Sequence, residues 1–411
     1  MNLHKARIFV IVSVTIILTL TLFLILSSKP LQIEEDGYIR EARALFKDVM
    51  EGLVKVRGLP FTDSANLHVV SIEWVKENWG RRSLEAIIKE VMVEEEIYKA
   101  LLLIPENVSL VKVRVEQSGW ILAATIGYEV YIVRDYFELS NEARAREIFA
   151  HELTHVLQGM HFQRPNIKFH DEKQAWTSLI EGDAILTTRM YMAFWKSSST
   201  TSISSAPKDL SKSFKDPLRE IWLFPYEYGK KFVEKIFEYQ GWDGVNGLYR
   251  RVPRSTTEIM HPEKYLQGWR FVEVDLVKLD GWEQVRVERF GEHFILVMLG
   301  THMPIERAMK AAEGWMGDKF IYYKKDGNRL FLWRIVWESE EDGIEFEGSF
   351  NHLMRVVKGV ELAPNYWKLP KQYIYIVRRG PEVFIIGSSI EVDELLKELS
   401  IQKEILTVIA R

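Results

Sequence analysis

Three residues with the spacing of a hydrolytic zinc site, His151, Glu152 and His155, form the pattern HExxH. On one turn of helix, two histidines four residues apart project from the same face and can bind one metal ion. Glu152 lies about 100° around the helix from His151, close enough to act on a water molecule at such a site. These residue types at this spacing are typical of a zinc hydrolase.

The residues around the pattern favour a metal site over two histidines that only hydrogen-bond within a core. Ser140 is a suitable N-cap, and the apolar residues from Ala145 to Leu157 form one stripe along the expected helix. Glu152 falls within the angular range of that stripe, where a buried carboxylate without a partner would be costly. We therefore predict that Glu152 is a general base that takes a proton from water.

A catalytic zinc ion needs a third protein ligand and one position left open for water. We expect this ligand to be Glu181, on a second helix over about residues 173 to 194. His161 is an alternative, because it occupies the last position of the pattern HExxHxxGxxH, although Gln158 stands where that pattern needs glycine. The remaining alternatives are His170, Asp171 and Asp183.

Further motifs follow the first one in a fixed order along the chain. They are HELTHVLQ from His151, LIEGDA from Leu179, FPYEYG from Phe224 and HPEKY from His261, followed by GWMGD from Gly314 with Trp337 downstream. In this order they resemble a poorly characterised group of prokaryotic gluzincin-like zinc metallopeptidases that are usually anchored in the membrane. The resemblance extends from about residue 130 to about residue 350.

The resemblance implies zinc-dependent peptide hydrolysis, with His151, His155 and Glu181 as zinc ligands and Glu152 as catalytic base. The chain departs from better-known gluzincins such as thermolysin four residues after Glu181, where they carry an acidic residue and this chain has Ile185. The side chain that orients a zinc histidine is therefore unassigned, and Asp183 is a candidate for it.

Peptide hydrolysis also needs a hydrogen-bond donor for the oxyanion of the tetrahedral intermediate. Tyr226, Tyr228 and His261 are the candidates, because they lie in the distinctive downstream motifs. Each of them has a structural alternative: an aromatic residue near a proline often packs at a helix start, and His-Pro-Glu often forms a turn.

An apolar segment near the N-terminus predicts a membrane anchor. Ile8 to Leu26 is 19 residues without a charge, enough to cross a hydrocarbon core of about 30 Å as a helix. Lys5 and Arg7 before it favour a cytoplasmic N-terminus. A cleaved signal peptide is the alternative, but its apolar core would be shorter. We expect a cytoplasmic tail over 1–7, an uncleaved transmembrane anchor over 8–27, and a single-pass location in the cell membrane with an extracellular catalytic domain.

Composition excludes several other classes of protein. The chain of 411 residues has no cysteine, so that disulfides and thiolate ligands are excluded. Its 54 Lys and Arg against 58 Asp and Glu give a net charge of -4 without a basic tract, which gives no support to nucleic-acid binding. The expected partners are a peptide or protein substrate and the membrane.

The pattern of apolar residues predicts an α+β fold in two domains. We expect a zinc peptidase domain over 31–268, with a Ser/Thr-rich loop over 196–216, and an α+β C-terminal domain over 269–411. Val111 to Val115 alternates like a strand, and Tyr128 to Val133 predicts either a cleft-edge strand that pairs with an extended peptide or an ordinary core strand.

Taken together, these features predict a membrane-anchored zinc metalloprotease that acts outside the cytoplasm. One rival hypothesis is a non-catalytic surface binding or assembly protein on a peptidase scaffold, although such a scaffold has no use for a general base at Glu152. A second rival is a zinc hydrolase that acts on a non-peptide amide.

Overall fold

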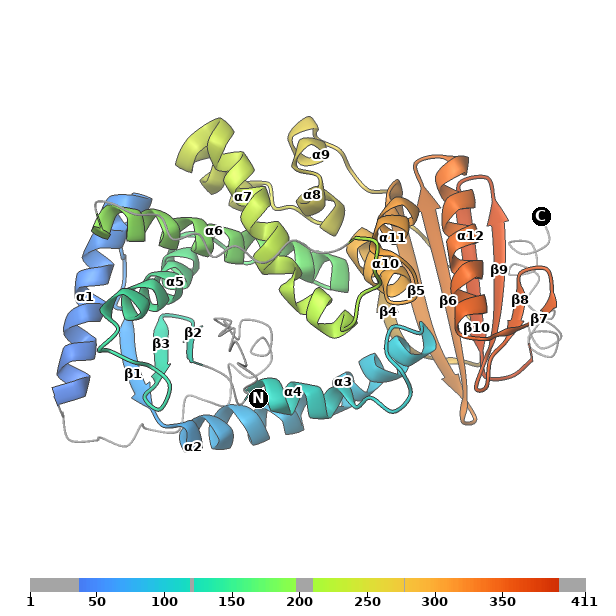
Figure 1. Ribbon diagram of the computed structural model, residues 1–411, viewed down its shortest axis with the longest axis horizontal. Helices are drawn as coiled ribbons and strands as arrows, with labels where there is room; N and C mark the ends of the chain where they lie inside the picture. Colours follow the sequence, from blue (N-terminus) through green and yellow to red (C-terminus); the bar gives the residue numbers. More distant parts are fainter. Residues whose placement is uncertain (1–36, 119–121, 197–209, 277, 392–411) are drawn as a thin grey trace, which may run out of the picture.

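The structure is a computed structural model that describes residues 37–118, 122–196, 210–276 and 278–391. A small sheet lies at one end of the molecule and a large sheet at the other, with long helices between them (Figure 1). This mixture of α and β elements is compatible with the predicted α+β class.

The small sheet has three strands, in the order β1-β3-β2, with β1 parallel and β2 antiparallel to the central strand β3. One face of it packs on the helix that carries the HExxH pattern. The elements at this end are α1 (Gly37–Arg57), β1 (Asn66–Val70), β2 (Ala123–Ile126), β3 (Glu129–Val133) and α5 (Glu142–His161).

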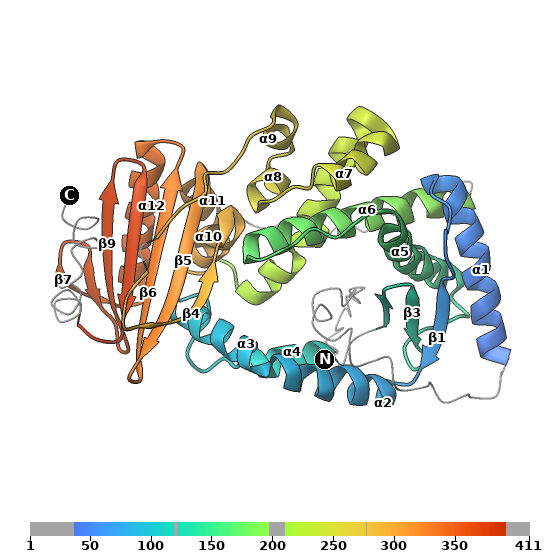
Figure 2. The same ribbon diagram turned by 180° about the vertical axis from the view of Figure 1, so that it is seen from behind.

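The large sheet is antiparallel, in the order β4-β5-β6-β10-β9-β8-β7. Figures 1 and 2 show from opposite sides that α10, α11 and α12 cover one face of it. The elements at this end are β4 (Glu283–Glu288), α10 (Gly291–Gly300), α11 (Ile305–Ala312), β5 (Trp315–Lys325), β6 (Asn328–Trp337), α12 (Glu340–Val356), β7 (Val360–Ala363), β8 (Tyr366–Lys368), β9 (Tyr373–Arg379) and β10 (Glu382–Ser388).

Two sets of helices lie between the sheets, on opposite sides of the molecule (Figure 2). One set contains the 27-residue helix α6, which runs from the small-sheet end to α10. Its members are α6 (His170–Lys196), α7 (Pro217–Arg250), α8 (Thr256–Met260) and α9 (Pro262–Gln267). The other set is α2 (Ile72–Val75), the π-helix η2 (Lys76–Arg81), α3 (Arg82–Ala100) and α4 (Leu110–Ser118).

Most of the expected elements are confirmed, and two local predictions are wrong. Residues 111–115 lie in the helix α4, because Ser109 caps its start by accepting from the Lys112 backbone N–H and Glu95 accepts from that of Leu110. Asn141, and not Ser140, caps α5 by accepting from the Arg144 backbone N–H. The strand expected at residues 128–133 is β3. It pairs on both sides, so that the alternative of a core strand is confirmed and that of a cleft-edge strand is not.

The structure contradicts the prediction of a membrane-spanning helix and of a single-pass location in the cell membrane. Across the four described ranges, no helix is both long enough and apolar enough to cross a membrane. The longest helices contain charged residues along their length. In α6, for example, Glu181 and Asp183 lie near the middle. The assignments of 1–7 and 8–27 lie outside the described residues, as do residues 197–209 of the Ser/Thr-rich loop. The extracellular placement of the catalytic domain is withdrawn with the anchor.

Helices α6 and α7 cross in close contact because each has a glycine at the crossing point. A Cβ atom on Gly182 would lie 2.2 Å from the backbone oxygen of Gly229, and one on Gly229 would lie 2.2 Å from the backbone oxygen of Ser178. Any larger side chain would therefore separate the two helices. Gly182 follows Glu181 directly, so this contact also determines how deeply Glu181 is placed.

We predict that Gly182→Ala lowers the free energy of unfolding by about 2 kcal/mol or more, because the new methyl group collides with backbone atoms that cannot move independently. Urea denaturation followed by circular dichroism would measure the loss. Gly348→Ala is the matched control: Gly348 lies in α12 with nothing within 4 Å of its Cβ position, and its replacement is expected to stabilise by about 0.5 kcal/mol. Equal effects of the two substitutions would contradict the close crossing.

Candidate metal centre

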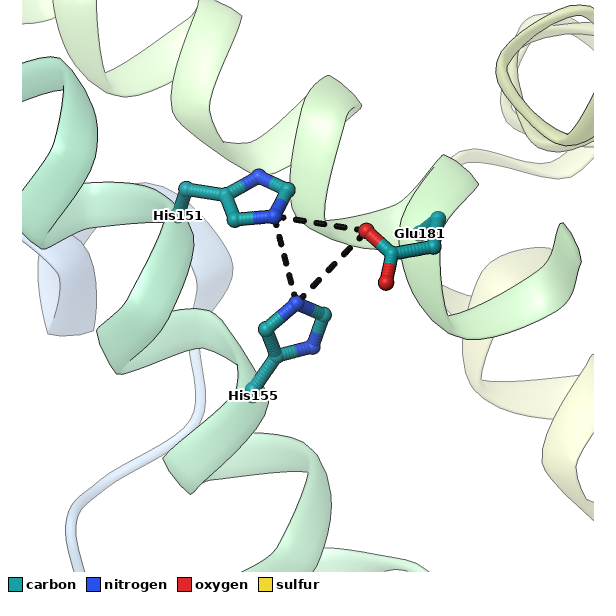
Figure 3. A group of neighbouring side chains, drawn as sticks. All are labelled: His151, His155 and Glu181. Atoms are coloured by element: carbon teal, nitrogen blue, oxygen red, sulfur yellow. Dashed lines mark hydrogen bonds and ion pairs between the residues drawn. The ribbon is translucent and has the colours of Figure 1, made fainter. Parts of the chain in front are cut away.

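Two adjacent helices bring together the three side chains of the candidate metal centre. His151 and His155 project from one face of α5, and Glu181 projects towards them from α6 (Figure 3). All three are buried, and one ligand atom from each lies within 4.8 Å of the others. Among the described residues this is the one group of histidine and acidic side chains with such an arrangement, and it could bind a metal ion.

The distances within the group fit a small tetrahedral ion. His151 Nε2 lies 3.2 Å from His155 Nε2 and 3.3 Å from Glu181 Oε2, and His155 Nε2 lies 3.7 Å from the same oxygen. In a tetrahedron with bonds of about 2.0–2.1 Å, two ligand atoms are separated by about 3.4 Å. The ligand atoms therefore need to move little to share one ion. Glu181, which the sequence predicts as the third ligand, is the third member of this group.

Opposite charges stabilise the group when no metal is bound. Burial by itself would raise the pKa of Glu181, but the charge on His155 and hydrogen bonds from both histidines lower it to about 2. Burial would likewise lower the pKa of His155, but the Glu181 carboxylate raises it to about 9. The site thus favours positive charge at the point where the three side chains meet, which is what a cation requires.

Glu152 is fully buried, as its place in the apolar stripe predicts. The Thr125 hydroxyl of β2 donates to Glu152 Oε2 at 2.7 Å. The other carboxylate oxygen, Oε1, has no hydrogen-bond partner among the described residues. Glu152 also acts on His155 electrostatically, since its charge contributes to the raised pKa of that residue. One oxygen is therefore held by β2 and the other is available as a proton acceptor.

A polar chain behind the metal group orients His155. The Nδ1 atom of His155 lies 2.8 Å from Gln158 Oε1, and the Gln158 amide donates to the backbone carbonyl of Ile180 at 2.9 Å and to Asp183 Oδ2 at 3.2 Å. The partner of His155 is thus Gln158, with Asp183 one step further away. The signal for this was present in the sequence, because Gln158 follows His155 by one helical turn.

Asp183 is held by side chains from two other helices. Arg57 of α1 donates to it at 3.1 Å, and Tyr249 of α7 donates at 2.7 Å. Arg57 also donates to Asn246 at 2.8 Å and stacks on the ring of Trp242, 4.3 Å from its centroid. Asp183 therefore serves as the centre of a buried network that joins α1, α6 and α7.

The alternative ligands His161 and Asp171 interact with residues outside the metal group. His161 ends α5 with its Nε2 atom 2.7 Å from the Pro60 carbonyl oxygen. Asp171 pairs with Arg289 at 3.2 Å and accepts from the backbone N–H and hydroxyl of Thr256, both at 2.7 Å. Asp171 thus fastens the start of α6 to the large-sheet end of the molecule. His170 begins α6, and its backbone N–H donates to Glu288 at 2.9 Å.

The three expected oxyanion donors are not in the metal group. Tyr228 of α7 stacks on Phe224, with ring centroids 4.9 Å apart. Tyr226 lies one turn after Trp222 on the same helix, with ring centroids 6.1 Å apart. His261 lies between α8 and α9, with its Nε2 atom 2.8 Å from Glu292 Oε1 of α10. Of these contacts, that of His261 joins the segment between α8 and α9 to α10, whereas the two tyrosine contacts lie within α7. The catalytic roles of the three residues stay predictions.

Comparison with known proteins finds a match for the large-sheet end only. Residues 278–397 match a domain of unknown function (DUF8575). This match covers well under half of the chain and includes none of the metal group. No curated protein and no solved structure matches the chain. The resemblance to gluzincin-like peptidases therefore stays an expectation from the motifs.

We predict that Gln158→Ala weakens metal binding about tenfold to a hundredfold, because the His155 ring loses the partner that fixes its orientation. Competition with a chromogenic chelator would measure the affinity. Gln163→Ala, at an exposed position shortly after α5, is the matched control and should bind metal as the native chain does. An unchanged affinity in Gln158→Ala would contradict the orienting role.

Proposed function

We propose that the chain is a zinc-dependent hydrolase that cleaves peptide bonds, with His151, His155 and Glu181 as zinc ligands and Glu152 as general base. The observation that carries the proposal is the second buried carboxylate beside the metal group, with one oxygen held and the other without a partner among the described residues. A structural metal site with four protein ligands has no need of such a carboxylate.

The donor set supports zinc as the metal. Two imidazole nitrogens and one carboxylate oxygen, with no thiolate in the chain, form the ligand set of many catalytic zinc sites with one open position. A zinc ion held there would lower the pKa of water and polarise the carbonyl of the substrate. The same set of ligands also suits iron in oxygenases, so the metal content is part of the test.

The residues of the chain would move one proton through the reaction. Glu152 Oε1 accepts a proton from the attacking water, and the same carboxyl group then delivers it to the nitrogen of the leaving amine. The Thr125 hydroxyl keeps Oε2 in place while Oε1 exchanges the proton. One group thus acts first as base and then as acid, and the bond between the carbonyl carbon and the nitrogen breaks.

The edge of the small sheet supports an extended peptide as substrate. Among the described strands, β2 pairs on one side only, with β3. The contact between Thr125 and Glu152 places this edge strand next to the general base. A peptide that pairs with the other edge of β2 would therefore run past Glu152, as β-strand addition requires.

We predict that the purified chain contains zinc and cleaves an unstructured protein, and that Glu152→Gln keeps the metal and loses cleavage by about a thousandfold. Mass spectrometry for metal content and a fluorogenic casein assay would measure the two properties. Removal of the metal by a chelator should abolish cleavage and lower the melting temperature, because the metal binds only the folded state. Glu147→Gln, at the surface of α5 beside Arg144, is the matched control.

Three results would count against the proposal. Bound metal without cleavage of any protein or peptide would favour a non-catalytic binding protein. Cleavage confined to non-peptide amides would favour the other hydrolase hypothesis. Iron in place of zinc in the purified protein would indicate oxygen chemistry.

We predict further that Thr125→Val lowers kcat about tenfold and leaves KM and zinc content unchanged, because Glu152 loses only its orientation. Steady-state kinetics on a quenched peptide would measure both constants. Thr125→Ser retains the hydroxyl and should restore most of the rate. A rate in Thr125→Val equal to that of the native chain would contradict the role of β2 in holding the base.

A further inference from the structure

A second cluster of charged side chains lies at the start of α6, far along the helix from the metal group. It combines side chains from four elements, each of which acts electrostatically on others in the cluster. They are Glu94 of α3, Arg114 of α4, His170 and Lys173 of α6, and Glu288 of β4. The cluster therefore lies where three helices meet the first strand of the large sheet.

Several members of this cluster have partners within the protein. Arg114 pairs with Glu94 at 2.6 Å, and the Tyr98 hydroxyl donates to the other oxygen of Glu94 at 2.8 Å. Glu288 accepts from the backbone N–H of His170 at 2.9 Å. Burial raises the pKa of Glu288 to about 7, so that its negative charge is incomplete at neutral pH.

Two nitrogen groups in the same place have no such partner. The Lys173 ammonium makes no ion pair within the described part of the chain, although it is partly buried and burial lowers its pKa. The buried Nε2 atom of His170 likewise has no hydrogen-bond partner there. Burial lowers the pKa of His170 to about 4, so the ring is neutral and has one N–H to donate. Burial of such polar groups is costly in free energy unless a ligand supplies the missing hydrogen-bond or ion-pair partner.

The position of His170 on α6 relates it to the metal group. His170 and Glu181 are eleven residues apart, close to three turns of helix, so they project from nearly the same face. At a rise of about 1.5 Å per residue, the two positions are about 16 Å apart along the axis. An extended peptide covers that distance with about five residues.

We propose that Lys173 and His170 form a subsite for a carboxylate of the substrate, about five residues away from the bond that is cleaved at the metal group. The inference rests on the proposed function, since it assigns a substrate class to the same enzyme. A carboxylate can accept a charge-assisted hydrogen bond from the ammonium and a second bond from the imidazole N–H. Glu94 and Glu288 beside them disfavour a doubly charged group such as phosphate.

The carboxylate has two possible sources, the C-terminus of a peptide or an Asp or Glu side chain, and the test separates them. Short fluorescent peptides are compared on the full zinc-loaded chain carrying Glu152→Gln, which binds them without cleavage. One pair differs in a free or an amidated C-terminus, and a second series has Asp or Asn at successive positions. Fluorescence anisotropy measures the affinity of each peptide.

We expect one carboxylate to strengthen binding about tenfold over its neutral counterpart. Lys173→Met in the same background should remove that difference, and Lys173→Arg should keep most of it. Lys168→Met is the matched control, because Lys168 is exposed and precedes α6, and it should leave the difference unchanged. Zinc content and melting temperature show which variants are folded.

Equal affinities for charged and neutral peptides would overturn the subsite, and so would a difference that persists in Lys173→Met. Loss of the difference in Lys168→Met to the same extent would overturn it as well. Cleavage of neutral peptides by the native chain distinguishes this failure from failure of the proposed function. If the native chain cleaves no peptide, the proposed function fails, and the subsite fails with it.

Discussion

The position of one carboxylate, that of Glu181, depends on α6 being held from two sides at once. On the side of α5, the Gln158 amide donates to the backbone carbonyl of Ile180, directly before Glu181. On the side of α7, Gly182 lies against the backbone of Gly229 with no room for a side chain between them. Helix α6 can therefore neither withdraw from the histidines nor rotate away from them, and the buried charges remain close together.

The motif Glu181-Gly182-Asp183 combines three separate physical roles in three consecutive residues. The first places a carboxylate oxygen in the group that could bind a metal ion, the second permits the close crossing of two helices, and the third is the centre of the polar network that reaches α1 and α7. The motif at Gly314 to Asp318 has a comparable structural role. Asp318 accepts from the backbone N–H groups of Phe290 and Gly291 and so caps α10. Motifs with several roles in a few residues tolerate little substitution.

The metal group was the most predictable part of the molecule, because helical spacing alone relates His151, Glu152 and His155. Glu181 was predictable as the acidic residue of a second helix, since the chemistry requires a third ligand. The contribution of Thr125 was not, because it comes from a strand that pairing with β3 brings beside α5. Long-range contacts of this kind leave no periodic signal in the sequence.

The wrong prediction of a strand at residues 111–115 has a local cause. Alternating valines from Val111 to Val115 have the period of a strand, but the cap at Ser109 and the contact of Leu110 with Glu95 favour a helix. The strand β3 could not be distinguished from an edge strand, because its β-branched and aromatic residues suit either position. Its pairing with β1 depends on residues more than sixty positions away, as in the register of Asn66 with Glu129.

Because α6 is one continuous helix, it limits which insertions and deletions the protein can accept during evolution. A helix behaves as a rigid spacer, so gain or loss of a single residue between Lys173 and Glu181 would turn one end by about 100° relative to the other. Substitutions on its surface leave that relation intact, whereas length changes destroy it. Insertions and deletions should therefore accumulate in the surface loops of this lineage, while the interior of α6 keeps a constant number of residues.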